Sequence, residues 1–235
     1  MTKAILSPRY PVFAERLNTL GFEIVFTEEV GSFIPYEKYH ADMQCLITGD
    51  HAFVLSRCKR LQDALATDYT VIPCGEEIDG EYPRNIALNA LILNDKLIRL
   101  TEHIDEKLRS HAALMGLESI RVKQGYTRCS CAVAGEHAVI TADRGIAGII
   151  GERGDLDVLL ISPGHIRLDG AAYGFIGGAC GYYDHKLYCC GDLSTHPDAD
   201  RISAFCNNHA CEIIELTDPY KPETPLTDIG GIVFC

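Results

Sequence analysis

Cysteine and histidine are the residue types in this sequence best suited to do chemistry, and two of them stand out. Cys235 ends a short apolar run, residues 231–234, that follows a Gly-Gly pair. A thiol is the side chain most readily made nucleophilic near neutral pH, although Cys235 also suits the apolar end of a strand. His165 follows Pro163 and Gly164 in an expected loop. Polar residues on loops held by rigid strands often act in function, but His165 could equally bond a neighbouring carbonyl.

The elements that must position these residues follow a repeat. Five times the sequence gives two short apolar strands joined by a tight turn, then a helix and another strand. The clearest copy has strands at 131–134, 138–141 and 158–161, with a helix over 145–153 that Asp143 caps. Turns near residues 50, 95, 136 and 185 recur about every 41–49 residues. Four units are therefore complete within the chain.

The fifth unit is split between the two ends of the sequence. Residues 231–234 supply its first strand and residues 4–6 the second, followed by a helix near 12–20 and a strand at 22–26. Pairing the ends removes an exposed sheet edge. We expect one α/β domain over residues 1–235: a pseudo-fivefold β/α-propeller whose fifth blade is closed by the terminal strands. A two-domain α/β arrangement is the alternative.

Composition limits the function. The net charge of −12 and the absence of a Lys/Arg-rich run argue against a nucleic-acid partner, and an acidic field favours cationic small molecules. No apolar stretch is long enough to span a membrane. The first 30 residues lack a secretory pattern, so we expect a cytoplasmic protein. Its eleven cysteines contain no CxxC, and Cys129 and Cys131 form an isolated CxC, so neither a metal nor another cofactor is expected.

The order of these units resembles the pentein fold, the five-bladed β/α-propeller of the guanidino-group-modifying superfamily. Arginine deiminases, agmatine deiminases and dimethylarginine dimethylaminohydrolases belong to it. Three stretches carry the resemblance: residues 175–180 running on through 187–194, residues 41–46, and the tail 230–235. More specifically, the half from 125 to 231 resembles an uncharacterised bacterial branch of this fold.

The resemblance implies a reaction. In the superfamily a cysteine thiolate attacks the guanidinium carbon, a histidine moves the proton, and carboxylates hold the planar cation by charge-assisted hydrogen bonds. Asp42 matches the acid of the early blade and Cys235 the nucleophile. Thr127 stands where the histidine should be, so His165 becomes the substitute base if its loop folds over the ring mouth. Arg128, a fixed cation, would attract a carboxylate or phosphate instead.

These observations predict a small-molecule site in the ring mouth. The expected activity is hydrolysis of a guanidino or amidine C–N bond. The alternatives are an inactive binder of a polar or anionic ligand anchored by Arg128, and a protein-interaction scaffold; the oligomeric state is left open. The predicted catalytic residues are Cys235, His165 and Asp42, and the predicted ligand-binding residues are Arg128, Asn89, Asp228, Cys129 and Gly178.

Overall fold

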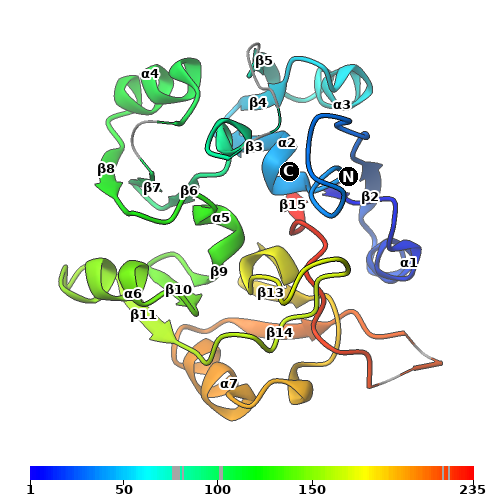
Figure 1. Ribbon diagram of the computed structural model, residues 1–235, viewed down its shortest axis with the longest axis vertical. Coiled ribbons are helices and arrows are strands. Elements are labelled where there is room, and N and C mark those ends of the chain that lie inside the picture. Colours follow the sequence, from blue (N-terminus) through cyan, green and yellow to red (C-terminus); the bar gives the residue numbers. More distant parts are fainter. Residues whose placement is uncertain (76–79, 81, 101–102, 219, 222) are drawn as a thin grey trace.

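The strands form five small sheets placed around a common centre (Figure 1). The structure, a computed structural model, describes residues 1–235 except 76–79, 81, 101–102, 219 and 222. In every sheet the middle strand pairs antiparallel with one neighbour and parallel with the other. The predicted order of strand, strand, helix and strand is therefore confirmed. The five sheets remain separate and do not join into one barrel among the described residues.

Four of the sheets each come from one continuous segment. Their middle strands are almost entirely buried, which explains the apolar runs in the sequence. The elements in chain order are β3 (Cys45–Thr48), β4 (His51–Leu55), α3 (Lys59–Leu65) and β5 (Thr70–Cys74); β6 (Leu91–Leu93), β7 (Lys96–Arg99), α4 (Glu106–Leu114) and β8 (Glu118–Arg121); β9 (Cys131–Gly135), β10 (Ala138–Thr141), α6 (Arg144–Gly151) and β11 (Asp157–Leu160); and β12 (Cys180–Tyr183), β13 (Lys186–Cys189), α7 (Ala199–Asn208) and β14 (Glu212–Glu215).

The fifth sheet joins the two ends of the chain, as predicted. It consists of β15 (Val233–Phe234), β1 (Lys3–Leu6) and β2 (Glu23–Phe26), with α1 (Pro11–Thr19) between the last two. Ala4 lies opposite Phe234 in the antiparallel register, and Ile5 lies opposite Val233. The labelled ends of the chain accordingly lie close together in Figure 1.

Side-chain caps fix three of the helical starts among the described residues, and one of them is α4, where Asp105 accepts the backbone N–H of Lys107 at 2.8 Å. Asp143 accepts a hydrogen bond from the backbone N–H of Ile146 at 2.8 Å, and Asp192 accepts one from Ser194 at 2.8 Å at the start of η3 (Leu193–Thr195). Thr195 and Asp198 precede α7 and are of residue types that often cap helices, which predicts a cap there, but Asp198 at the N-cap position makes no capping hydrogen bond. The carboxylate of Asp198 instead accepts the backbone N–H of Ser162 at 2.6 Å, because the loop after β11 packs against this helix start.

Short helical turns precede several of the first strands, and the sequence did not reveal them. They are α2 (Ala41–Gln44), η1 (Arg84–Ile86), α5 (Thr127–Ser130) and η2 (Gly177–Ala179). Residues 44, 178 and 179, expected in strands, lie in these turns, which are too short to show helical periodicity. The longer helices lie toward the outside of the ring in Figure 1, whereas α2 and α5 lie toward its centre.

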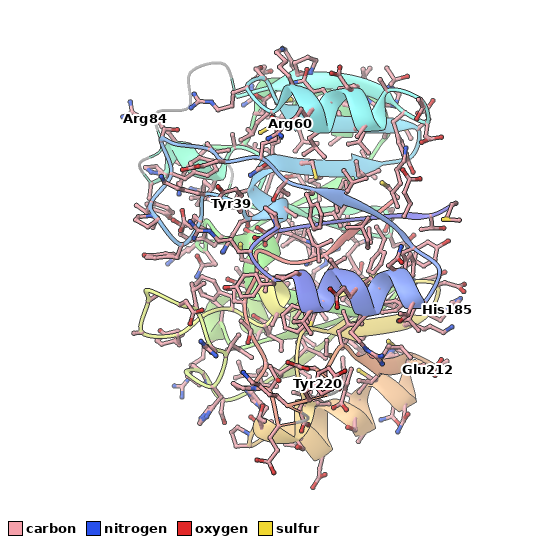
Figure 2. All side chains as sticks on the ribbon, turned by 90° about the vertical axis from the view of Figure 1, so that its right-hand side faces the viewer. Tyr39, Arg60, Arg84, His185, Glu212 and Tyr220 are labelled. Atoms are coloured by element: carbon pink, nitrogen blue, oxygen red, sulfur yellow. The ribbon has the colours of Figure 1, made fainter. Side chains whose placement is uncertain are left out.

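The two faces of the ring carry different connections. Figure 2 shows Tyr39 and Arg84 on one face, and His185 and Glu212 toward the opposite one. His185 belongs to a hairpin turn, in which Asp184 and His185 adopt positive φ angles of 49° and 57°. None of the helices formed by the described residues has the length and apolar character needed to cross a membrane.

Candidate functional site

The short turns bring polar side chains from different blades together at the centre of the ring. Asp42 lies on α2 and Cys129 on α5. One donor atom each from His40, Asp42 and Cys129 lie within 4.8 Å of one another, and all three residues are buried. The predicted residues Asp42 and Cys129 are thus neighbours, and they share this cluster with a histidine that sequence reasoning missed.

Asp42 is the most perturbed acid of the cluster. Both of its carboxylate oxygens are inaccessible to water, and among the described residues neither has a hydrogen-bond partner apart from the nearby thiol of Cys129. Burial raises its pKa to about 8, and the negative charge of Asp228 adds to the rise. The thiol of Cys129 and the charge of Arg128 act in the opposite direction. A buried carboxyl group without a partner is costly, so this arrangement is typical of a site that awaits a ligand.

Asn89 holds the thiol of Cys129 in place. Its amide Nδ2 donates to the sulfur at 3.0 Å and to the backbone oxygen of Asp42 at 3.2 Å. Its Oδ1 accepts the backbone N–H groups of Arg128 at 2.9 Å and Cys129 at 3.3 Å. One buried side chain therefore ties the segment before β6 to α2 and α5. The sequence placed Asn89 at the site, and the structure places it against Asp42 and Cys129.

Asp228 is fixed by backbone groups from two loops. Its Oδ2 accepts the N–H of Phe175 at 2.8 Å, and its Oδ1 accepts the N–H of Gly230 at 2.9 Å. Gly178 lies against this carboxyl group, where an added Cβ would overlap it. The oxygen of Gly178 also accepts the N–H groups of Ile229 and Gly231 at 2.9 and 2.7 Å. Gly178 thus allows the close packing predicted for it.

A cavity of about 290 Å³ opens above this centre. Its wall is aromatic on several sides, and the rings of Tyr126 and Phe175 lie 6.1 Å apart at an angle of 28°. The acidic residues Glu37 and Asp228 and the thiol-bearing Cys129 also line it. The lining residues are Tyr36, Glu37, His40, Tyr126, Cys129, Leu168, Ala171, Ala172, Tyr173, Phe175 and Asp228.

A second buried acid, Glu37, borders the cavity. Asn85 donates to Glu37 at 2.9 Å and to the hydroxyl oxygen of Tyr126 at 3.0 Å. Burial raises the pKa of Glu37, and the charge of Asp228 raises it further. Glu37 and His40 were missed because they lie in the linker between β2 and α2. The dense run of Tyr36, Glu37, Tyr39 and His40 was the available signal.

Cys235, the predicted nucleophile, lies at the end of β15. Its backbone N–H donates to the oxygen of Lys3 at 3.0 Å. The groups that act on its thiol are Lys3, Asp68, Tyr69 and Glu23, and burial raises its pKa to about 11. The cavity described above is lined by Cys129 and not by Cys235.

His165 and Arg128 also face other surroundings. The ring of His165 meets that of His196 edge-on at 5.4 Å between centroids. Arg128 donates to the backbone oxygen of Cys131 at 3.2 Å and lines a separate cavity of about 430 Å³, together with Glu136 and Phe234. The structure therefore brings together Asp42, Asn89, Cys129, Gly178 and Asp228. Cys235, His165 and the side chain of Arg128 do not line the 290 Å³ cavity, although the charge of Arg128 acts on Asp42.

Solved structures with a similar fold include dimethylarginine dimethylaminohydrolases and an amidinotransferase. DDAH from Pseudomonas aeruginosa, in a cysteine-to-serine mutant complexed with citrulline, is 13% identical with a TM-score of 0.58, covering 95% of this chain and 84% of that one. A dimethylarginine dimethylaminohydrolase adduct with S-methyl-L-thiocitrulline is 12% identical with a TM-score of 0.59, covering 95% and 96%. An amidinotransferase from Microseira wollei is 10% identical with a TM-score of 0.53, covering 98% and 93%.

The fold is therefore that of the pentein superfamily, as the sequence resemblance predicted. The model of the family of unknown function DUF6873 matches residues 5–233, and the chain belongs to this family. None of the curated proteins compared with the chain is significantly similar to it.

Proposed function

We propose that this protein binds a guanidinium or amidinium cation in the cavity at the ring centre and cleaves one of its C–N bonds. The observation that carries the proposal is Asp42, a buried acid with a carboxylate oxygen within 4.8 Å of the donor atoms of His40 and Cys129, two residues that line the cavity. A planar cation supplies N–H donors in the geometry that carboxylates accept best. The similar enzymes named above act on or bind compounds of this class, which supports the same substrate class here.

Charge and shape of the cavity favour such a cation. Asp228 and Glu37 line it and Asp42 lies just behind. A cation about 4 Å from one carboxylate gains about 4 kcal/mol at an effective dielectric constant of 20, before the cost of leaving water. The nearly parallel rings of Tyr126 and Phe175 provide faces against which a planar cation can stack.

Cys129 is the proposed nucleophile and His40 its proton acceptor. The sulfur forms a bond to the central carbon of the cation, while the thiol proton passes to the imidazole of His40. The C–N bond then breaks, and the leaving amine takes that proton. Water next adds to the same carbon and the C–S bond breaks. One proton of the water restores the thiol, and the other leaves on the released amine, which departs as an ammonium ion. Burial lowers the pKa of His40, so the imidazole is neutral and able to accept.

The thiol of Cys129 is inactive until the cation arrives. Burial raises its pKa, and the charges of Asp42 and Asp228 raise it further. A cation bound beside the sulfur favours the thiolate and so lowers the pKa of this thiol. The amide of Asn89, which donates to the sulfur, favours the thiolate as well.

Further parts of the proposal are the five-bladed propeller closed by β15 and β1, and a cytoplasmic location. All eleven cysteines are free thiols, and a reducing compartment keeps them so.

The test is release of ammonia, urea or amine from a panel of guanidino and amidino compounds, with binding followed in parallel by thermal shift. We expect Cys129→Ser to abolish release while binding persists, and Cys235→Ser to retain both. Loss of release in Cys235→Ser alone would return the nucleophile to Cys235. Binding without release by the unmodified protein would identify an inactive binder. A panel that neither binds nor reacts contradicts the proposal.

A further inference from the structure

Three side chains of different chemistry converge at the ring centre. His40, Asp42 and Cys129 offer a nitrogen, an oxygen and a sulfur atom that all lie within 4.8 Å of one another. They come from two separate parts of the chain. His40 directly precedes α2 and Asp42 lies on it, whereas Cys129 lies on α5. We propose that this cluster binds one divalent transition-metal ion of the Zn²⁺ class.

Asp42 shows that the cluster is more than packed core. Its two oxygens are inaccessible to water, and within the described part of the chain neither has a hydrogen-bond partner besides the thiol of Cys129, another proposed ligand. Native proteins leave few buried polar atoms unpaired, and an ion is one of the groups that satisfy them. Bound between the three donors, a divalent ion would balance the charges of the carboxylate and the thiolate.

The donor set selects the metal. A thiolate and an imidazole favour Zn²⁺ and Co²⁺, whereas Mg²⁺ and Ca²⁺ prefer oxygen ligands. Three protein ligands are the usual number in zinc sites that keep a fourth position open. His40 and Cys129 both line the 290 Å³ cavity, so the fourth position lies on the side from which a water molecule or small anion can enter.

Neighbouring groups orient two of the three ligands. Asn89 donates to the sulfur of Cys129 at 3.0 Å. His40 interacts through its ring with the backbone of Tyr36. Hydrogen bonds of this kind fix the direction of metal ligands, and their loss lowers metal affinity by about 10- to 100-fold.

The metal and the cation compete for the same atoms. A metal bound to the sulfur of Cys129 removes the nucleophile, and its charge repels a guanidinium group. Zn²⁺ therefore inhibits the reaction, and a chelator restores it. This inhibition rests on the proposed function, whereas the metal site itself does not.

The experiment uses the full chain, treated with chelator, dialysed and kept reduced by a phosphine. Co²⁺ is added while absorption is recorded. We expect one Co²⁺ per chain, with a thiolate-to-cobalt charge-transfer band and the d–d bands of a four-coordinate ion, and displacement by Zn²⁺. Absence of a charge-transfer band at one equivalent in the unmodified protein would overturn the proposal without recourse to any variant.

Variants then locate the ion. Cys129→Ser should lose the charge-transfer band, and Asp42→Asn should weaken Co²⁺ binding by more than the factor of about 10 to 100 expected for Asn89→Ala. Cys235→Ser is the control and should bind as the unmodified protein does. Circular dichroism confirms that each variant is folded. A band that persists in Cys129→Ser or disappears in Cys235→Ser places the metal elsewhere.

The two proposals can fail separately. Stoichiometric Co²⁺ binding in a protein that neither binds nor cleaves any guanidino compound supports the metal site and contradicts the proposed function. If the protein cleaves a guanidino compound, Zn²⁺ leaves that cleavage unchanged and no cobalt spectrum is seen, the proposed function is supported and the metal site is contradicted.

Discussion

Asn89 and Cys129 contact each other twice, once through the side chain and once through the backbone. The amide Nδ2 of Asn89 lies 3.0 Å from the sulfur of Cys129, and its Oδ1 lies 3.3 Å from the backbone nitrogen of the same residue. The pair therefore fixes both the position and the direction of the thiol. It also joins two blades whose sheets share no strand.

Loss of this contact should destabilise the whole chain. Asn89→Ala leaves the buried N–H groups of Arg128 and Cys129 without an acceptor. Each such group costs about 1–3 kcal/mol, so we expect the free energy of unfolding to fall by about 2–6 kcal/mol in urea titrations. Asn207→Ala, at an exposed position of α7, is the control and should change it by less than about 0.5 kcal/mol. Equal effects of the two substitutions would contradict the assigned role.

The raised pKa of Asp42 should make stability depend on pH in chelator-treated protein. Its folded-state pKa of about 8 lies above the usual 3.8, so the native state holds the proton more tightly than the unfolded state. Its contribution is fully present below pH ~4 and is lost, at about 1.4 kcal/mol per unit, as pH rises toward 8. Glu37 acts in the same direction, since its pKa is also raised.

Asp42→Asn removes that titration while leaving the shape nearly unchanged. We expect the fall in unfolding free energy between pH 5 and 8 to become shallower in this variant, by about 1 kcal/mol per unit. The charged neighbours named for Asp42, which are Asp228, Arg128 and Glu37, remain in both proteins. Parallel curves for the two proteins would show that Asp42 is ionised in the native state throughout this range.

Gly178 should tolerate no side chain. A Cβ at this position overlaps the carboxyl group of Asp228, which is itself held by the N–H groups of Phe175 and Gly230. We expect Gly178→Ala to lower the melting temperature through overpacking that costs about 1–3 kcal/mol, and to weaken cation binding. Gly148→Ala on α6 is the matched control, because a Cβ there meets nothing within 4 Å. It should be neutral or stabilising.

The final strand should be required for folding. Removal of residues 228–235 takes away Asp228 and all of β15, and leaves β1 without its antiparallel neighbour. The exposed edge and the lost core residues Ile229 and Ile232 should yield insoluble or unfolded protein. A truncated chain ending at Thr227 that is soluble, with the far-UV circular dichroism of the full chain, would contradict this prediction.

The sequence alone predicted the repeated architecture. Short apolar runs, Gly- and Asp-containing turns and helix caps such as Asp143 are local signals, and each depends on neighbouring residues only. The pairing of the two chain ends follows from counting the repeats. The C-terminal end supplies a first strand with no second strand after it, and the N-terminal end supplies a second strand with no first strand before it. Each end therefore provides the strand that the other lacks. The sequence and its resemblance to the pentein fold also predict Asp42, Asn89, Cys129, Gly178 and Asp228 as site residues.

The tertiary structure decided which of those residues meet. Cys235 and His165 carry suitable chemistry, yet β15 directs Cys235 toward Lys3 and Tyr69, and the loop after β11 sets His165 against His196. His40 and Glu37 come from a linker with no periodic pattern, and only the packing of that linker over the ring centre brings His40 to Asp42 and Cys129. The spacing of hydrophobic residues determines the helices and strands. The site depends on distances between segments that are far apart in the chain, and no local sequence pattern encodes those distances.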